Sequence, residues 1–197
     1  MTRLLPTLLL SLAALCQAAP AAAQARLPTV VLGDSLTNGG AWSQNFPNEV
    51  VVNQGISGDT TEGMLARVDA VNAVRPGKVL IMAGINDLLR GKPVEATLAN
   101  YAQILARLDD GGKRLVVQST LYTRPPANVL VNDYVRKLDE GLLTLCTANR
   151  RCTYIDVNTV VAPEGFLIAG FTTDGLHLNQ PGYEAWFKLL KDRRLMD

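Results

Sequence analysis

One serine, one histidine and one aspartate in this sequence could together perform nucleophilic acyl transfer. Ser35 follows an apolar run (residues 29–32) that predicts a buried strand. His177 is the only histidine of the 197 residues, and Asp174 lies three positions before it. A carboxylate at that spacing can accept a hydrogen bond from Nδ1 of the imidazole, which leaves Nε2 free to accept the proton of a serine hydroxyl. We therefore predict Ser35 as the nucleophile, His177 as the general base and Asp174 as the acid that orients the base.

Acyl transfer through a serine also needs hydrogen-bond donors for the negative oxygen of the transition state. Two loops offer such donors, each after a predicted strand: Gly58 could present its backbone N–H, and Asn86 its side-chain amide. The backbone N–H of Ser35 would be a third donor. Gly58 is preferred to Gly55 because it immediately precedes Asp59, the predicted N-cap of the next helix. The predicted oxyanion hole is therefore made by Ser35, Gly58 and Asn86.

The elements that must position these residues alternate between strand and helix patterns. Apolar runs predict five strands, at residues 29–32, 49–53, 78–82, 114–119 and 153–157. Apolar side chains at helical spacing predict helices that begin near residues 59, 93, 133 and 180. This alternation predicts an α/β protein with a parallel sheet, whose strands all end at one edge. The loops that carry the candidate residues should therefore meet at that edge.

Four short blocks of sequence, in a fixed order, carry these residues. They are Gly-Asp-Ser-Leu at 33–36, Asn-Gln-Gly-Ile-Ser-Gly-Asp at 53–59, Gly-Ile-Asn-Asp at 84–87 and Asp-Gly-Leu-His at 174–177. By these blocks the chain resembles the GDSL, or SGNH, hydrolase family, and none of them departs from the family pattern. The resemblance implies a flavodoxin-like three-layer α/β/α sandwich around a five-stranded parallel sheet, ester or thioester substrates, and no cofactor. It also implies the catalytic and oxyanion roles already given to the five candidate residues.

The substrate is less closely determined than the reaction. We expect carboxylic esters with short to medium acyl chains, bound in an open apolar groove whose rims are residues 88–92, 120–132 and 163–171. A carbohydrate O-deacetylase is one alternative, because Trp42 or Phe46 could stack on a sugar. A thioesterase or lysophospholipase with the same triad is another, and acyl transfer to an alcohol would use the same residues. The alternative that is not an enzyme is a catalytically silent module that binds a glycan or a lipid.

The N-terminus has the pattern of a secretory signal peptide. Arg3 precedes an apolar run at residues 4–15, and an Ala-Gln-Ala sequence at 23–25 offers a cleavage site. We expect cleavage after Ala25, a single hydrolase domain at residues 26–197, and a secreted or periplasmic protein. The apolar run is too short to span a bilayer as a helix, so no stable membrane insertion is expected after cleavage.

Composition argues against several other classes of protein. Charged residues make up 19% of the chain, hydrophobic residues 48%, and the net charge is +1. These values are ordinary for a globular protein and lack the basic excess that nucleic-acid binding requires. The expected partner is a small-molecule ester, and the oligomeric state stays open.

The cysteines and the remaining carboxylates suggest structural roles. Signal-peptide cleavage would remove Cys16 and leave Cys146 and Cys152, six positions apart. In an oxidising compartment these two could close a small loop as a disulfide, which we favour over two free thiols. No cluster of His, Cys, Asp and Glu has the spacing of metal ligands, so no metal site is predicted.

Four further aspartates are expected to play no part in the chemistry. Asp34 and Asp87 are predicted to hold their loops through backbone N–H groups. Asp139 and Asp156 have no evident partner in the sequence, and they are predicted to be solvated or to cap helices.

Overall fold

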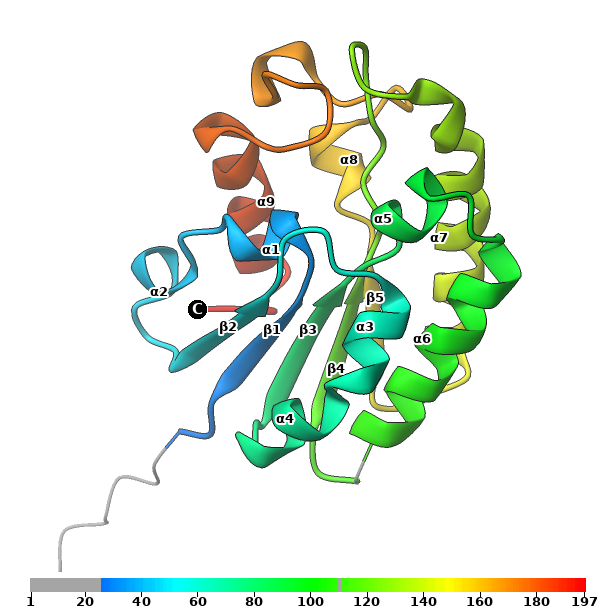
Figure 1. Cartoon of the computed structure of the whole chain (residues 1–197). Helices are drawn as coiled ribbons and strands as arrows, with labels where there is room; N and C mark the ends of the chain where they lie inside the picture. The colour runs from blue at the N-terminus through cyan, green and yellow to red at the C-terminus, as the bar shows by residue number, and fades with distance from the viewer. Residues whose placement is uncertain (1–25, 110) are drawn as a thin grey trace, which may run out of the picture.

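Five parallel strands in the order β2-β1-β3-β4-β5 form the middle layer of the fold (Figure 1). The structure is a computed structural model that describes residues 26–109 and 111–197, so the predicted signal peptide lies outside the described residues. The strands are β1 (Thr29–Gly33), β2 (Val51–Gly55), β3 (Lys78–Met82), β4 (Arg114–Gln118) and β5 (Cys152–Ile155). This sheet confirms the predicted α/β class and the parallel arrangement.

Helices cover both faces of the sheet, which makes three layers (Figure 1). One face carries α3 (Thr61–Ala66), α4 (Val68–Ala73), α6 (Val94–Leu108) and α7 (Asn132–Thr147). The other carries α1 (Ser35–Asn38), α2 (Trp42–Asn45), α8 (Asn158–Val161) and α9 (Gln180–Asp192). The short helix α5 (Ile85–Leu89) follows β3, and two 3₁₀ turns, Val129–Val131 and Ala169–Phe171, lie in the long loops.

Strand residues point alternately into two separate hydrophobic cores. In β1, Val30 and Leu32 pack with α3, α4, α6 and α7, whereas Val31 packs with α1, α2, α8 and α9. The central strands are buried on both faces, which is why they read as unbroken apolar runs in the sequence.

Two of the differences between the observed and the expected element boundaries involve salt bridges. β2 begins two residues later than expected. Glu49, which was expected to begin the strand, forms a salt bridge with Lys78 at 2.8 Å. The helix expected from residue 59 begins at Thr61, and its N-cap is Thr60, not Asp59. Asp59 instead forms a salt bridge with Arg67, at the break between α3 and α4.

The aromatic residues Trp42 and Phe46 are buried in the core, where a sugar cannot reach them. Their exposed fractions are 2% and 0%. Trp42 packs edge-on against Trp186, with ring centroids 5.2 Å apart, and Phe46 packs against Phe187. The prediction that either could stack on a sugar is therefore wrong, because both rings are used to dock α2 onto α9.

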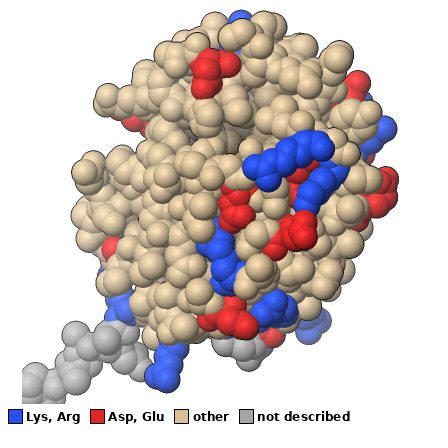
Figure 2. All heavy atoms as spheres, viewed as in Figure 1, with Lys and Arg blue, Asp and Glu red and all other residues tan. Residues whose placement is uncertain are grey.

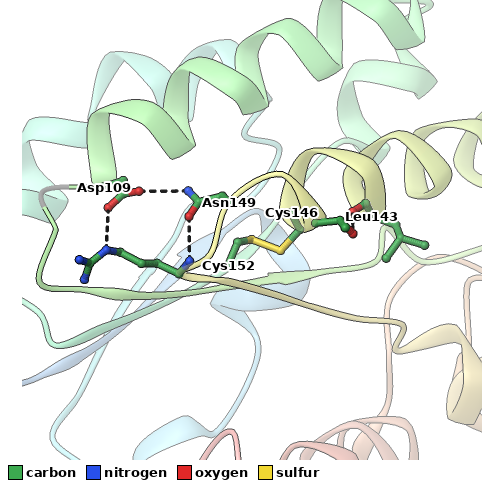
Figure 3. Close-up of a disulfide and its surroundings, with 7 residues drawn as sticks. Asp109, Leu143, Cys146, Asn149 and Cys152 are labelled. Atoms are coloured by element: carbon green, nitrogen blue, oxygen red, sulfur yellow. Dashed lines mark hydrogen bonds and ion pairs between the residues drawn. A yellow bond between two sulfur atoms is a disulfide. The ribbon is translucent and has the colours of Figure 1, made fainter.

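Cys146 and Cys152 are joined by a disulfide, as favoured from the sequence (Figure 3). Cys146 lies in the last turn of α7 and Cys152 is the first residue of β5, so the bond ties a helix end to an edge strand. In the turn between them, Asn149 donates a side-chain hydrogen bond to Asp109 and accepts one from the backbone N–H of Arg151.

No helix within residues 26–109 and 111–197 is long and apolar enough to cross a membrane.

The disulfide should be detectable directly and should contribute to stability. Because it closes a short loop, we expect the double variant Cys146→Ser/Cys152→Ser to lose about 2 kcal/mol of unfolding free energy. Alkylation of the denatured protein without reductant, followed by mass spectrometry, should label neither Cys146 nor Cys152. Labelling of both thiols would contradict the bond.

Candidate active site

Ser35 stands at the start of α1, two residues after β1 ends. Asp34 is the N-cap of this helix: its Oδ1 accepts a hydrogen bond from the N–H of Leu36 at 3.0 Å. Gly33 is required before it, because a Cβ at this position would clash with Oγ1 of Thr37 and the carbonyl oxygen of Met82. The backbone N–H of Ser35 lies in the first turn of α1, where helical N–H groups have no intrahelical acceptor.

The structure brings Ser35, His177 and Asp174 into one hydrogen-bonded chain. The Ser35 hydroxyl oxygen lies 3.0 Å from Nε2 of His177, and Nδ1 of the same ring lies 2.6 Å from Oδ2 of Asp174. The carboxylate at Nδ1 selects the neutral tautomer with the proton on Nδ1 and a lone pair on Nε2. The side chains of His177 and Asp174 are 47% and 50% exposed, so the chain opens to solvent.

Asp174 is held in its charged form by its surroundings. Its Oδ1 accepts hydrogen bonds from the backbone N–H groups of Leu176 at 2.9 Å and His177 at 2.8 Å. Burial acts to raise the pKa of Asp174, but the hydrogen bonds from the imidazole and from these two N–H groups outweigh it. They hold the pKa of this carboxyl well below its ordinary value.

The turn that carries Asp174 and His177 depends on Gly175. This glycine has a φ of +82°, and a Cβ there would clash with the carbonyl oxygen of Arg124. Its own carbonyl oxygen accepts a hydrogen bond from the N–H of Arg124 at 2.9 Å. A β-bridge between Thr172 and Leu178 closes the turn. The loop after β4 therefore supports the segment that presents the histidine.

Gly58 and Asn86 lie side by side next to this chain of residues. Nδ2 of Asn86 donates a hydrogen bond to the carbonyl oxygen of Asp59 at 3.0 Å, which places the amide against the Gly58–Asp59 peptide. An amide nitrogen carries two hydrogens, so the second remains for a ligand. Gly58 has a φ of +76°, which a side chain would make strained. The structure thus gathers all five predicted site residues at the carboxyl edge of β1, β2 and β3.

Two of the three predicted rims of the groove meet around a pocket of about 480 Å³. Arg124 and Pro125 line it from one segment, and residues 163–169 from the other. Phe166 and Ile168 lie partly exposed in that lining. Residues 88–92 lie elsewhere, beside the Gly58 loop, where Arg90 donates a hydrogen bond to the carbonyl oxygen of Gly58 at 2.7 Å.

Within the described residues there is no group of three or more His, Cys, Asp or Glu side chains that could hold a metal ion.

Comparison with known proteins identifies the family. The model of the GDSL-like lipase/acylhydrolase family matches residues 31–185, a range that includes all five site residues. The chain belongs to this family. A GDSL-like lipase from Bacteroides thetaiotaomicron has the same fold, with a TM-score of 0.71 and 23% identity over 84% of this chain and 86% of that chain.

Two relatives match by sequence over part of their length. An arylesterase from Vibrio mimicus is 35% identical over 123 residues, which cover 55% of this chain and 60% of that protein. An N-acylneuraminate cytidylyltransferase from Streptococcus agalactiae is 27% identical over 153 residues, which cover 77% of this chain and 35% of that protein. The chain thus spans less than two thirds of the length of these relatives.

Arg67 is a site residue of this GDSL-family chain that the sequence reasoning missed. Its guanidinium donates to the carbonyl oxygens of Gln54 at 2.9 Å and Gly33 at 3.2 Å, and it forms a salt bridge with Asp59 at 2.7 Å. It therefore ties the ends of β1 and β2 to the loop of Gly58. The sequence contained a signal for this role. Arg67 lies three residues after Met64, on the apolar face of the predicted helix, where a charged side chain needs a partner.

Asp34 and Asp87 hold loops, as predicted for this family's blocks. Asp87 is buried and accepts hydrogen bonds from the backbone N–H and the hydroxyl of Thr61, which docks α3 against α5. Asp34 is fully buried, and its Oδ2 has no hydrogen-bond partner among the described residues. Burial raises the pKa of Asp34 to about 7.

Asp139 differs from its prediction as a solvated or capping carboxylate. It accepts hydrogen bonds from the backbone N–H of Thr120 at 2.7 Å and from Nδ2 of Asn158 at 3.2 Å, and burial raises its pKa to about 8. Packing of α7 against the end of β4 leaves it half-buried. Asp156 accepts a hydrogen bond from the backbone N–H of Asn158, the first residue of α8, whose N-cap is Val157.

Asp34→Asn should change how stability depends on pH. A pKa raised on folding means that the unfolded chain loses the Asp34 proton near pH 4, whereas the folded chain keeps it until about pH 7. Ionisation therefore favours unfolding increasingly from pH 4 to pH 7. We expect the unfolding free energy of the variant, measured by urea titration, to rise relative to the natural protein across that window and to level off above it.

Asp133→Asn on the exposed side of α7 is the matched control for Asp34→Asn. A stability difference for Asp34→Asn that stays constant from pH 4 to pH 8 would show that Asp34 keeps its charge when buried.

Proposed function

We propose that this GDSL-family protein is a serine esterase that hydrolyses carboxylic esters with short to medium acyl chains through an acyl-serine intermediate. The observation that carries the proposal is the hydrogen-bonded chain from the Ser35 hydroxyl through His177 to Asp174. Three donors beside it, the N–H groups of Ser35 and Gly58 and the amide of Asn86, can receive an oxyanion.

In the first half of the proposed reaction, Nε2 of His177 takes the proton of the Ser35 hydroxyl as its oxygen bonds to the ester carbonyl carbon. The carbonyl oxygen becomes an oxyanion, which each donor stabilises by about 2.7–4 kcal/mol. Asp174 stabilises the imidazolium. His177 then gives the same proton to the ester oxygen, the bond between that oxygen and the acyl carbon breaks, and the alcohol leaves.

In the second half, water replaces the alcohol. His177 takes a proton from the water as its oxygen bonds to the acyl carbon, and the oxyanion forms again between the same donors. The bond to Ser35 then breaks, and His177 returns the proton to the serine oxygen. One ester and one water give one alcohol and one carboxylic acid, and no cofactor enters the balance.

Two features support short to medium acyl chains. His177 and Asp174 are each about half exposed, so a long chain would have little enclosed surface against which to bury. The pocket between Arg124 and residues 163–169 is about 480 Å³, which is within the range of small-molecule sites. A binding module has no need of an aligned base and acid, which argues against the non-enzymatic alternative.

We further propose that the protein works outside the cytoplasm, in the secreted or periplasmic space. The Cys146–Cys152 disulfide supports this location, since such bonds persist mainly in oxidising compartments.

Arg67 has a positioning role in this proposal. Its side chain binds both the carbonyl oxygen of Gly33, which precedes the nucleophile segment, and Asp59, which follows the oxyanion glycine. A fixed distance between Ser35 and Gly58 matters only when the tetrahedral intermediate forms. Disturbing Arg67 should therefore affect turnover more than substrate binding.

Ser35→Ala should lower kcat for p-nitrophenyl acetate by at least about 1,000-fold while the protein stays folded. Ser43→Ala, an exposed serine in α2, is the matched control and should keep full activity. A fluorophosphonate probe should label the natural protein at Ser35 only. Unchanged turnover in Ser35→Ala, or ligand binding without any turnover by the natural protein, would refute the esterase.

Arg67→Lys should lower kcat for the same ester by up to about 100-fold with little change in KM, since lysine cannot hold three acceptors in one plane. Arg107→Lys is the matched control, because Arg107 also joins a backbone carbonyl and an aspartate, but on the outer surface of α6. Equal kcat in folded Arg67→Lys and the natural protein would remove the positioning role.

A further inference from the structure

A second pocket, of about 520 Å³, lies between α2 and the beginning of α9. Its walls come from three segments: residues 39–45, residues 178–180 and the first two turns of α9. It is separate from the pocket at residues 163–169, and its volume is within the range of about 300–1,000 Å³ that small-molecule sites occupy. Neither the predicted rims nor the family blocks include its α2 wall.

Two walls of the pocket adjoin the proposed catalytic residues along the chain. Leu178 and Asn179 in its wall directly follow His177 in the chain. Gly39 in the opposite wall ends α1, the helix that begins with Ser35, so the two residues are only about 6 Å apart along the helix axis. Tyr183 holds the two walls together, because its hydroxyl donates to the carbonyl oxygen of Leu36 at 2.8 Å.

The direction of proton transfer determines which part of the ester would lie in this pocket. His177 must give its proton to the ester oxygen that leaves, so the alcohol portion has to extend on the side of the histidine. The oxyanion donors Gly58 and Asn86 are on loops after β2 and β3, whereas this pocket is walled by the residues that follow His177. The pocket is therefore placed for the alcohol and not for the carbonyl oxygen.

The lining of the pocket favours a neutral, hydroxyl-rich ligand. Side-chain amides dominate it, from Gln44, Asn45, Asn179 and Gln180, beside the rings of Tyr183 and Phe187. Its one charged residue, Glu184, already accepts a hydrogen bond from Gln180 at 2.9 Å. The amide of exposed Gln44 makes no hydrogen bond within the described residues, so both its donor and acceptor are available to a ligand.

The surface beside the pocket, over α1 and α2, is without charged side chains. Figure 2 shows many of the Lys, Arg, Asp and Glu side chains of this face over α3, α5 and α6, and none over α1 and α2. An anionic alcohol would find no positive charge in the lining of the pocket.

We infer that the pocket between α2 and α9 binds the alcohol portion of the ester, and that this alcohol is a neutral carbohydrate. The inference rests on the proposed function and specifies its substrate class: a sugar carrying an ester-linked acyl group such as acetate. Gln44 is its specificity-determining residue, through hydrogen bonds to sugar hydroxyls. Hydrolysis follows the balanced steps given above, and the released alcohol is the free sugar.

Two substrates with the same acyl group but different alcohols test this inference. They are a mono-O-acetylated methyl glucoside and p-nitrophenyl acetate. We expect Gln44→Ala to lower kcat/KM for the sugar acetate about fivefold, mainly through KM, because a hydrogen bond to a sugar hydroxyl is lost. The value for p-nitrophenyl acetate should change by less than twofold. Ala41→Leu, which narrows the pocket from its exposed wall, should give the same selective loss.

Ser43→Ala, on the same helix but outside the pocket lining, is the matched control and should affect neither substrate. The inference is overturned if the natural protein hydrolyses p-nitrophenyl acetate but not the sugar acetate. It is equally overturned if both pocket variants retain full kcat/KM for the sugar acetate, or lose both substrates equally. Absence of activity on every ester would instead refute the proposed function, so the two failures are distinguishable.

Discussion

The site depends on the parallel register of β1, β2 and β3. Gly33 pairs with Gly55 on one side and with Met82 on the other, so the three strands end at the same level. Each following loop then needs only a few residues to deliver its side chain to the common edge. The close packing at this edge leaves no room for a Cβ at Gly33, and a Cβ at Gly55 would clash with the backbone at Asn38. Glycine at the ends of β1 and β2 is therefore a condition of the site.

Asp174 and Asp34 differ in their burial and in the direction of their pKa shifts. Asp174 is half exposed and is held ionised by hydrogen bonds, which suits a group that must stabilise an imidazolium. Asp34, next to the nucleophile in the chain, is buried, and burial raises its pKa to about 7. The two carboxylates thus have opposite pKa shifts because hydrogen bonds dominate at Asp174 and burial dominates at Asp34. Only the first can serve as the acid of a triad.

Much of this arrangement was predictable because it is local. The tight turn at Asp174–His177 needs a glycine and a carboxylate three residues before the ring, and both can be read from the sequence. The strands were found because burial on both faces makes them continuously apolar. Local reasoning failed where a side chain had a distant alternative: Asp59 was expected to cap a helix, but it pairs with Arg67, and Thr60 caps the helix instead. The prediction for Trp42 was wrong for the same reason, since its partner Trp186 lies 144 positions away in the chain.

The sequence by itself determined the residue types of the site, their order and the class of fold, because these follow from side-chain chemistry and from short-range periodicity. Tertiary structure alone decided the distances, such as 3.0 Å between the Ser35 hydroxyl and His177, which are 142 positions apart. It also decided that Arg67 joins two strand ends, that Asp139 is half-buried, and that an amide-lined pocket opens between α2 and α9. These depend on the packing of helices against opposite faces of the sheet, and no spacing within the sequence encodes which surfaces will meet.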